Sequence, residues 1–399
     1  MRALLGGAVG ALALACAPAA YVITTATPAG ATTVSNEAQL RSAFDTDGQI
    51  TLANDITLTD CGSGDVDRNT SDAALVLEGA GHTITQTCPD VRVLDVNTNS
   101  AVTLRDVTVT GGNTGGDGGG INMSSNNGGG GDLTVERSTF TANTGCDGGA
   151  IHAQPDGSAV SIVASTIAGN TANSDGGAVD MDNEDNLTLT NSTVTKNSSV
   201  DTAALDVDSP GVLSLVYATV VANTEGTTVC PDSVSADDDP VSSSEADPDG
   251  VHAAQIASVN ISAESDPSIF RSFGSVVALP GGGLPNCDVV NPDSQGYNFS
   301  DDSTCGFTAT GDRQDAGDPG LGALAGNGGP TQTMLPGAGS PLLDAIPPGS
   351  CQADGAAGVS TDQRGITRPQ GSGCDIGAVE VEVVAPAPIV ITVIPTFTG

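Results

Sequence analysis

The sequence contains no tryptophan, and aromatic residues make up only 3% of its 399 residues. Hydrophobic residues nevertheless make up 38%, which argues against a disordered chain of low hydrophobicity. A chain of this length can bury a sizeable core. Because large rings are scarce, that core must be built mainly from small and β-branched residues.

Basic residues are also scarce. Lysine and arginine together number 11 against 48 aspartates and glutamates, giving a net charge of −37, and Lys196 is the single lysine. Nucleic acids and anionic membranes bind clustered basic residues, so the composition argues against both as partners. It favours divalent cations or neutral and basic surfaces. The alternative interpretation is a solvated acidic surface that keeps the protein soluble.

The N-terminal segment, 1–31, has the features of an export signal. Arg2 precedes an apolar stretch over residues 4–20, and Ala29-Gly30-Ala31 forms a small-x-small cleavage site. A lipoprotein acylated at Cys16 is the alternative. The mature chain is predicted to be extracellular or associated with the cell envelope. It contains no apolar run long enough for a transmembrane segment.

Eight cysteines follow Cys16, and an even number in an exported chain indicates disulfides. Pairing nearest neighbours predicts three disulfides and leaves one further pair, which rests on elimination. The absence of a C-x-x-C pair gives no indication of zinc or redox chemistry. The predicted pairs are Cys61–Cys88, Cys287–Cys305, Cys351–Cys374 and, by elimination, Cys146–Cys230.

Asparagines recur at nearly even spacing, at positions 113, 143, 170, 197 and 223. A nearly fixed period of this size indicates stacked repeats. Short apolar runs, beginning at positions 102, 133, 160, 187 and 213, align as the first strand of successive units. We therefore predict an all-β fold, a right-handed parallel β-helix, in which the asparagines form an internal ladder at a turn. The ladder residues are Asn113, Asn143, Asn170, Asn197 and Asn223.

The rest of the chain is assigned around these repeats. The β-helix is predicted over residues 32–310, with a short N-terminal capping helix at 36–44 and an acidic insertion at about 226–250. The loop-rich segment 311–381, closed by Cys351 and Cys374, is expected to cap the open end of the solenoid. Residues 382–399 form an apolar tail.

Several uncommon strings occur in order between positions 318 and 380. They are GNGGPTQT at 326–333, GSP at 339–341, TDQRG at 361–365, RP at 368–369 and CDIGAVE at 374–380. This series resembles the C-terminal region of bacterial "choice-of-anchor Q" proteins, which are similar to polymorphic outer membrane and pectin-lyase-like β-helix proteins. The resemblance implies an exported, secreted or cell-surface β-helix. Members often continue into an anchoring segment, whereas the apolar run at 389–399 is too short to span a bilayer.

The first candidate site is a column of aspartates, each followed by small residues in successive repeats. If they stack on neighbouring coils, their carboxylates lie within ~5 Å of one another, and calcium would relieve the repulsion. In the alternative interpretation the side chains face solvent or bind turn amides. The column comprises Asp117, Asp147, Asp175 and Asp201.

A second candidate consists of Asp180, Asp182, Asp206 and Asp208, which alternate with apolar residues on two adjacent strands. We expect them to project outward as a two-by-two cluster with separations of ~5–7 Å, which overlap the carboxylate spacing of glycosidases. The alternative is a solvated acidic face. A lyase would need a base beside calcium, and basic residues are scattered, so a hydrolase is favoured over a lyase. His152 is expected to be a lone surface histidine.

Taken together, these features predict an exported, non-catalytic β-helix with an adhesive, carbohydrate-contacting or structural role. Its predicted partners are extracellular polysaccharide or components of the cell envelope. The alternative is a polysaccharide-active enzyme that uses the outward aspartates as its catalytic residues.

Overall fold

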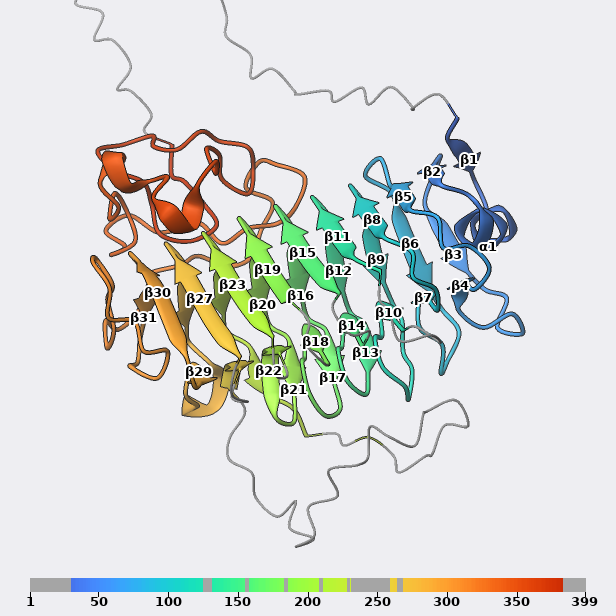
Figure 1. The fold of residues 1–399 in the computed structure, drawn as a ribbon, viewed down its shortest axis with the longest axis horizontal. Helices are drawn as coiled ribbons and strands as arrows, with labels where there is room; N and C mark the ends of the chain where they lie inside the picture. Colours follow the sequence, from blue (N-terminus) through green and yellow to red (C-terminus); the bar gives the residue numbers. More distant parts are fainter. Residues whose placement is uncertain are drawn as a thin grey trace, which may run out of the picture.

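The computed structural model describes residues 30–124, 131–154, 158–182, 186–207, 211–227, 230, 259–263 and 268–382. These residues form a parallel β-helix, whose coils follow one another from the N-terminal to the C-terminal end of the molecule (Figure 1). Three long parallel sheets and one short sheet run along the solenoid. The predicted all-β parallel solenoid is confirmed.

The sheets are numbered 1 to 4 here, and a coil that contains all four passes through sheets 1, 2, 4 and 3 in that order. Sheet 1 comprises β1 (Thr32–Val34), β2 (Gln49–Leu52), β5 (Leu75–Glu78), β8 (Val102–Arg105), β11 (Leu133–Glu136), β15 (Ala159–Val163), β19 (Asn186–Thr190), β23 (Val212–Val216), β27 (Ile269–Phe273) and β30 (Pro292–Gly296). Sheet 2 comprises β3 (Ile56–Leu58), β6 (Thr83–Gln86), β9 (Thr108–Thr110), β12 (Thr139–Thr141), β16 (Thr166–Ala168), β20 (Thr193–Thr195), β24 (Thr219–Val221), β28 (Val276–Ala278) and β31 (Phe299–Ser300). Sheet 3 comprises β4 (Val66–Arg68), β7 (Leu94–Val96), β10 (Ile121–Met123), β14 (Ile151–Ala153), β18 (Val179–Met181), β22 (Thr202–Val207), β26 (Val259–Ala263) and β29 (Cys287–Val289). Sheet 4 comprises β13 (Thr144–Gly145), β17 (Thr171–Ala172), β21 (Ser198–Ser199) and β25 (Thr224–Glu225).

The core consists of columns of aliphatic side chains, one from each coil. In sheet 1, Leu133 pairs with Val160, which pairs with Leu187, and all three are buried. The alternation of apolar and polar residues along each strand produces these columns, since successive side chains point to opposite faces. Few aromatic residues are needed because each coil repeats the same narrow cross-section.

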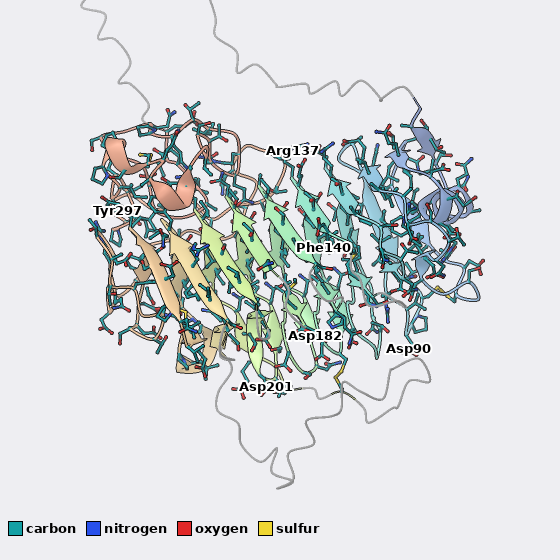
Figure 2. The ribbon with its side chains drawn as sticks, in the orientation of Figure 1. Asp90, Arg137, Phe140, Asp182, Asp201 and Tyr297 are labelled. Carbon is teal, nitrogen blue, oxygen red and sulfur yellow. A yellow bond between two sulfur atoms is a disulfide. The ribbon has the colours of Figure 1, made fainter. Side chains whose placement is uncertain are left out.

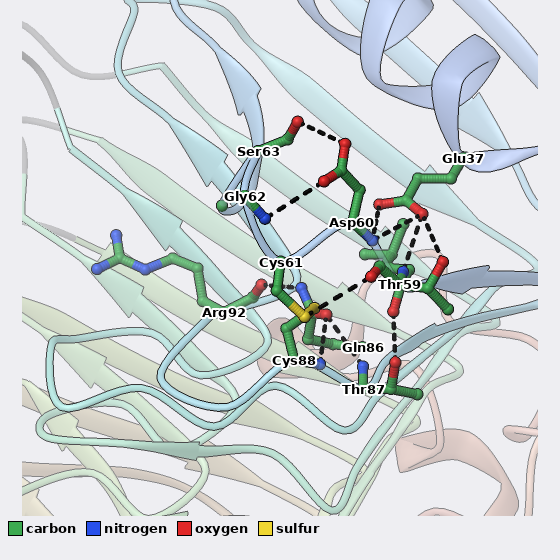
Figure 3. Close-up of a disulfide and its surroundings, with 12 residues drawn as sticks. Glu37, Thr59, Asp60, Cys61, Gly62, Ser63, Gln86, Thr87, Cys88 and Arg92 are labelled. Atoms are coloured by element: carbon green, nitrogen blue, oxygen red, sulfur yellow. Dashed lines mark hydrogen bonds between the residues drawn. A yellow bond between two sulfur atoms is a disulfide. The ribbon is translucent and has the colours of Figure 1, made fainter.

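The N-terminal end is closed by α1 (Glu37–Thr46), as predicted, with Asn36 as the N-cap: its side chain accepts a hydrogen bond from the backbone N–H of Gln39. The helix buries Leu40 and Phe44. Glu37 accepts hydrogen bonds from the backbone of Thr59 beside the Cys61–Cys88 disulfide, which ties two neighbouring coils together (Figure 3).

The C-terminal segment begins at the last coil and continues along the flank of the solenoid. Residue Arg313 forms a bridge with Phe299 of β31, and later residues contact much earlier coils, for example Gln363 with Thr193 of β20. Figure 1 shows this segment beside the ends of β15, β19, β23 and β27. It contains η2 (Pro348–Ser350) and η3 (Asp354–Ala356), whereas η1 (Gly281–Gly283) precedes it. The segment therefore covers the flank as well as the last coil.

Some predicted regions lie outside the described residues: the export signal up to residue 29, most of the acidic insertion, and the apolar tail beyond residue 382. Among the described helices, none combines the length and apolar character needed to cross a membrane.

Candidate functional site

The buried asparagine ladder sets the register of the coils. The side-chain amide of Asn143 donates to the Oδ1 of Asn170, that of Asn170 to Asn197, and that of Asn197 to Asn223, each at 3.0 Å. Each Oδ1 also accepts a hydrogen bond from the backbone N–H of the preceding ladder residue, at 2.9–3.1 Å. All four side chains are buried.

Asn113 does not belong to this ladder, which corrects the sequence prediction. The backbone N–H of Gly112 donates to Asn143 Oδ1, so Gly112 holds the ladder position, and Asn113 is exposed. The ladder instead continues at the other end, where Asn223 donates to Asn260 and Asn260 to Asn286. The sequence did not reveal these two residues because the insertion interrupts the period before Asn260.

The predicted aspartate column follows the ladder in each coil. The backbone N–H of Asp147 donates to Asp117 Oδ1 at 3.3 Å, and that of Asp175 donates to Asp147 Oδ1 at 3.2 Å. One oxygen of Asp117 and one of Asp147 therefore bind a backbone amide of the next coil, as the alternative interpretation of this column expects. Asp201 directly precedes β22 and is exposed (Figure 2). Calcium binding at this column stays a prediction.

The Cys146–Cys230 disulfide lies beside this column, since Cys146 directly precedes Asp147. The structure contains all four predicted disulfides: Cys61–Cys88, Cys146–Cys230, Cys287–Cys305 and Cys351–Cys374. A disulfide sulfur is not a thiolate ligand, so Cys146 does not add to a metal site with Asp117 and Asp147.

A row of polar residues runs along the outer side of sheet 3. Asn122 of β10 pairs with His152 of β14, His152 with Asp180 of β18, and Asp180 with Asp206 of β22. The turn before each strand folds closely over this row. Gly176 has φ +58°, and a Cβ there would lie 2.5 Å from the Cβ of Asp180. Only glycine permits both this backbone conformation and this approach.

The second candidate cluster is less exposed than the sequence indicated. Asp180 and Asp206 lie on adjacent strands as expected, but they are only 4% and 9% exposed, so these two fit neither the freely projecting cluster nor its alternative, a solvated acidic face. Asp182 is partly exposed, and Asp208 lies outside the described residues. Alternation correctly placed Asp180 and Asp206 on the outer side of their strands but did not indicate their burial, which at Asp180 results from the Gly176 turn.

His152 is the centre of the covered row rather than a lone surface histidine. It is 2% exposed, and its Nε2 lies 3.5 Å from Asp180 Oδ2 and 3.4 Å from Asp182 Oδ2. Its Nδ1 lies 2.9 Å from Asn122 Oδ1. Asn122 is oriented by its own amide, which donates to Asp95 Oδ1 at 3.0 Å. These partners lie one coil apart along the chain, so only the coil period could have indicated the contact.

Burial and charge shift the ionisation of the cluster. Burial acts to lower the pKa of His152, but the hydrogen bond with Asp182 and the charges of Asp117 and Asp147 raise it to about 9. Burial raises the pKa of Asp147 to about 6, helped by the charge of Asp117. The pKa of Asp180 is raised well above its usual value by burial and by neighbouring carboxylates.

A second acidic group lies nearer the N-terminal end, on β4 and β7. Arg92 is 3.4 Å from Asp65 and 2.9 Å from Asp95. Asp67 stands in register with Asp95. Burial raises the pKa of Asp67 to about 6, with additional repulsion from Asp95 and Asp65. This group has no sequence signature beyond the alternating acids at 65–67.

We expect Asp67→Asn to stabilise the protein at pH 7 and not at pH 4. Because the folded-state pKa of Asp67 is raised, its contribution is fully favourable below its unfolded pKa and is lost as the pH rises through about 6. Allowing for solvent screening at this partly exposed site, the gain at pH 7 is about 1 kcal/mol. Denaturant unfolding at both pH values measures it. Asp90→Asn, at an exposed position, serves as the control, and equal gains at both pH values would refute the assignment.

Threonines form a regular array on the outer side of sheet 2. Thr83, Thr108 and Thr139 are in register on β6, β9 and β12, and so are Thr85, Thr110 and Thr141 two positions later. All six are half-buried. On later coils the equivalent positions are covered, since Thr166 donates to Gln332 and Thr193 to Gln363 of the C-terminal segment. The sequence contains the repeated Thr-x-Thr pattern, but it does not indicate which of these threonines the C-terminal segment covers.

A model of the family described as "Putative pectate lyase-like adhesive domain" matches residues 31–145. This region contains α1, the first coils and the six-threonine array. No curated protein and no solved structure matches the chain. The match and the parallel coils agree in indicating a pectin-lyase-like β-helix, whereas the choice-of-anchor Q resemblance stays a prediction.

Proposed function

We propose that this protein is an extracellular adhesive β-helix without catalytic activity, which contacts neutral polysaccharide through its threonine array. The observation that carries the proposal is the overlap between the match to an adhesive domain at residues 31–145 and the array on β6, β9 and β12. The disulfides support an extracellular location. Calcium binding by the aspartate column belongs to the proposal, and a melting temperature raised by calcium and lowered by chelation tests it.

The array has the chemistry of a neutral contact surface. Hydroxyl groups recur at the strand spacing of ~4.8 Å along the solenoid, and each threonine adds a methyl group. Hydroxyls can both donate and accept hydrogen bonds with sugar hydroxyls. The net charge of −37 disfavours acidic polysaccharides, because like charges repel over the whole surface.

The alternative of a glycan-active enzyme depends on Asp180, Asp182, Asp206 and Asp208. Two of these acids, Asp180 and Asp206, are only 4% and 9% exposed, and the Gly176 turn lies against Asp180. A polymer substrate must reach both carboxylates of a glycosidase pair. Their burial therefore favours the adhesive role over the hydrolase.

Binding to insoluble polysaccharides tests the proposal. We expect the full chain to be retained on at least one of cellulose, chitin and xylan, and not on polygalacturonate. Thr110→Glu, at the centre of the array, should weaken retention at least tenfold, because it desolvates a carboxylate against sugar. Thr134→Glu, on sheet 1, carries the same charge change and should bind as the unmodified protein does.

Two results would contradict this function. One is retention that is equal for Thr110→Glu and the unmodified chain, or absent on every neutral polysaccharide. The other is release of reducing ends from a polysaccharide that is abolished by Asp180→Asn or Asp206→Asn. The second result would establish the enzyme instead.

A further inference from the structure

Three ligand atoms converge on one point at the outer side of sheet 3. They are His152 Nε2 from β14, Asp180 Oδ2 from β18, and Asp182 Oδ2 immediately after β18, and they come from two neighbouring coils. One ligand atom from each of the three residues lies within 4.8 Å of the other two, and Nε2 lies 3.5 Å and 3.4 Å from the two Oδ2 atoms. Asp182 has a side chain that is 29% exposed, so the group opens to solvent on that side.

The contacts of His152 Nε2 are longer than strong charge-assisted hydrogen bonds and are compatible with ligands around a shared cation. A charge-assisted N–H···O bond is ~2.7–2.9 Å long, whereas the distances from His152 Nε2 are 3.5 Å to Asp180 and 3.4 Å to Asp182. Ligands at ~2.0–2.2 Å from a tetrahedral ion lie ~3.3–3.5 Å apart. The observed separations match the second geometry.

The orientation of His152 leaves Nε2 available as a ligand. Asn122 donates its amide N–H to Asp95, which Arg92 also contacts, so the amide oxygen of Asn122 faces His152 Nδ1. Nδ1 must therefore carry a proton to complete a hydrogen bond. A metal-binding histidine commonly donates its other ring N–H in this way, which fixes the ring and the tautomer.

Asp180 supplies an independent reason for a cation. Its carboxylate is buried, and within the described part of the chain it accepts no hydrogen bond from a donor outside this group. A buried carboxylate without such donors is costly unless it takes up a proton or a cation compensates it. A single protonated histidine shared with Asp182 compensates two carboxylates incompletely.

We propose that His152, Asp180 and Asp182 bind a divalent transition-metal ion of the zinc class. Imidazole nitrogen is a ligand typical of zinc and related ions, whereas calcium prefers oxygen ligands alone. Three protein ligands leave a fourth position for water on the side of Asp182. The ion links β14 to β18, and so stabilises sheet 3 next to the glycine turns. No zinc site was indicated by the sequence, which lacks a C-x-x-C pair, but that motif indicates cysteine ligands and not a site formed by histidine and carboxylates.

Metal binding by the full chain, stripped with a chelator and dialysed, tests this site. We expect one equivalent of Zn²⁺ to bind and raise the melting temperature. Co²⁺ should give the intense visible absorption bands of tetrahedral coordination. A large excess of Ca²⁺ should leave Zn²⁺ bound. Titration against a chromophoric chelator measures the affinity.

The Zn²⁺ affinities of variants distinguish binding at this site from non-specific attraction of cations to an acidic protein. His152→Asn and Asp182→Asn should each lower the Zn²⁺ affinity at least tenfold, and Asn122→Ala should lower it ~10–100-fold through loss of ring orientation. His82→Asn removes a partly exposed histidine elsewhere on the coils and should not change it. If His152→Asn does not fold, the Zn²⁺ affinity of Asp182→Asn tests the site, because Asp182 is partly exposed.

Three outcomes would overturn the site. The unmodified chain could fail to bind Zn²⁺ stoichiometrically. The folded ligand variants could bind Zn²⁺ as tightly as the unmodified chain. Ca²⁺ could displace Zn²⁺ at comparable concentrations, which would indicate an oxygen-only site such as the aspartate column.

Discussion

Asn170→Ala should lower the free energy of unfolding by about 3–5 kcal/mol, because several buried polar groups lose their partners together. Asn170 Oδ1 accepts from the side chain and the backbone of Asn143, and its amide donates to Phe140 O and Asn197 Oδ1. Alanine leaves those groups unsatisfied in an interior that water does not reach. In a chain of this size the loss corresponds to roughly 5 °C in melting temperature.

Asn113→Ala is the matched control for this effect. Asn113 has the same residue type and nearly the same sequence spacing, but it is exposed and lies outside the ladder. We expect a change within about 0.5 kcal/mol. Denaturant unfolding of both variants, with disulfides intact, measures the difference. Equal losses would mean that the ladder does not hold the coils in register.

Arg368→Met should release the C-terminal segment from the flank. Arg368 is fully buried and forms an ion pair with Glu380 at 3.1 Å. It also donates to the backbone of Asp375 and Gly377 and lies 4.0 Å over the ring of Tyr217. Removing one partner of a buried pair typically costs ~3–5 kcal/mol, because the other charge is left uncompensated. We expect proteolysis to cleave the segment after residue 316 while the solenoid stays folded.

The unpaired Glu380 carboxylate of the Arg368→Met variant gives this prediction a pH dependence. Burial raises the pKa of Glu380 even in the intact protein. Without Arg368 the carboxyl group will take up a proton more readily, so the loss of stability should shrink as the pH falls. Glu380→Gln in the Arg368→Met background should recover part of the stability. A double variant no more resistant to protease than Arg368→Met alone would assign the effect to lost packing against Tyr217.

The solenoid could be predicted because its signal is local and repeated. Alternation along 133–135, 160–162 and 187–189 identifies the inward side chains, and the period assigns them to one column. The structure places Leu133, Val160 and Leu187 in that column. The first ladder position was ambiguous, because the interval before Asn143 is longer than the later ones. Spacing alone therefore could not decide whether Gly112 or Asn113 occupies that position.

The candidate site was only partly predictable, because alternation assigns a side of a strand and not its exposure. Asp180 does point to the outer side of β18, but Gly176 brings the preceding turn against it. His152 and Asp182 meet because their strands are neighbours, while Asn122 orients the ring from the other side. No single segment of sequence contains this arrangement.

By itself the sequence determined the strand pattern, the coil period and the acidic charge, because each depends on residue type and spacing alone. It predicted three disulfides from neighbouring cysteines and Cys146–Cys230 only by elimination. The tertiary structure decided which outward residues are covered, that the C-terminal segment lies along the flank, and that His152 joins two aspartates. These features depend on contacts between different coils or between segments far apart in the chain, such as Thr193 and Gln363. Local periodicity carries no information about such contacts.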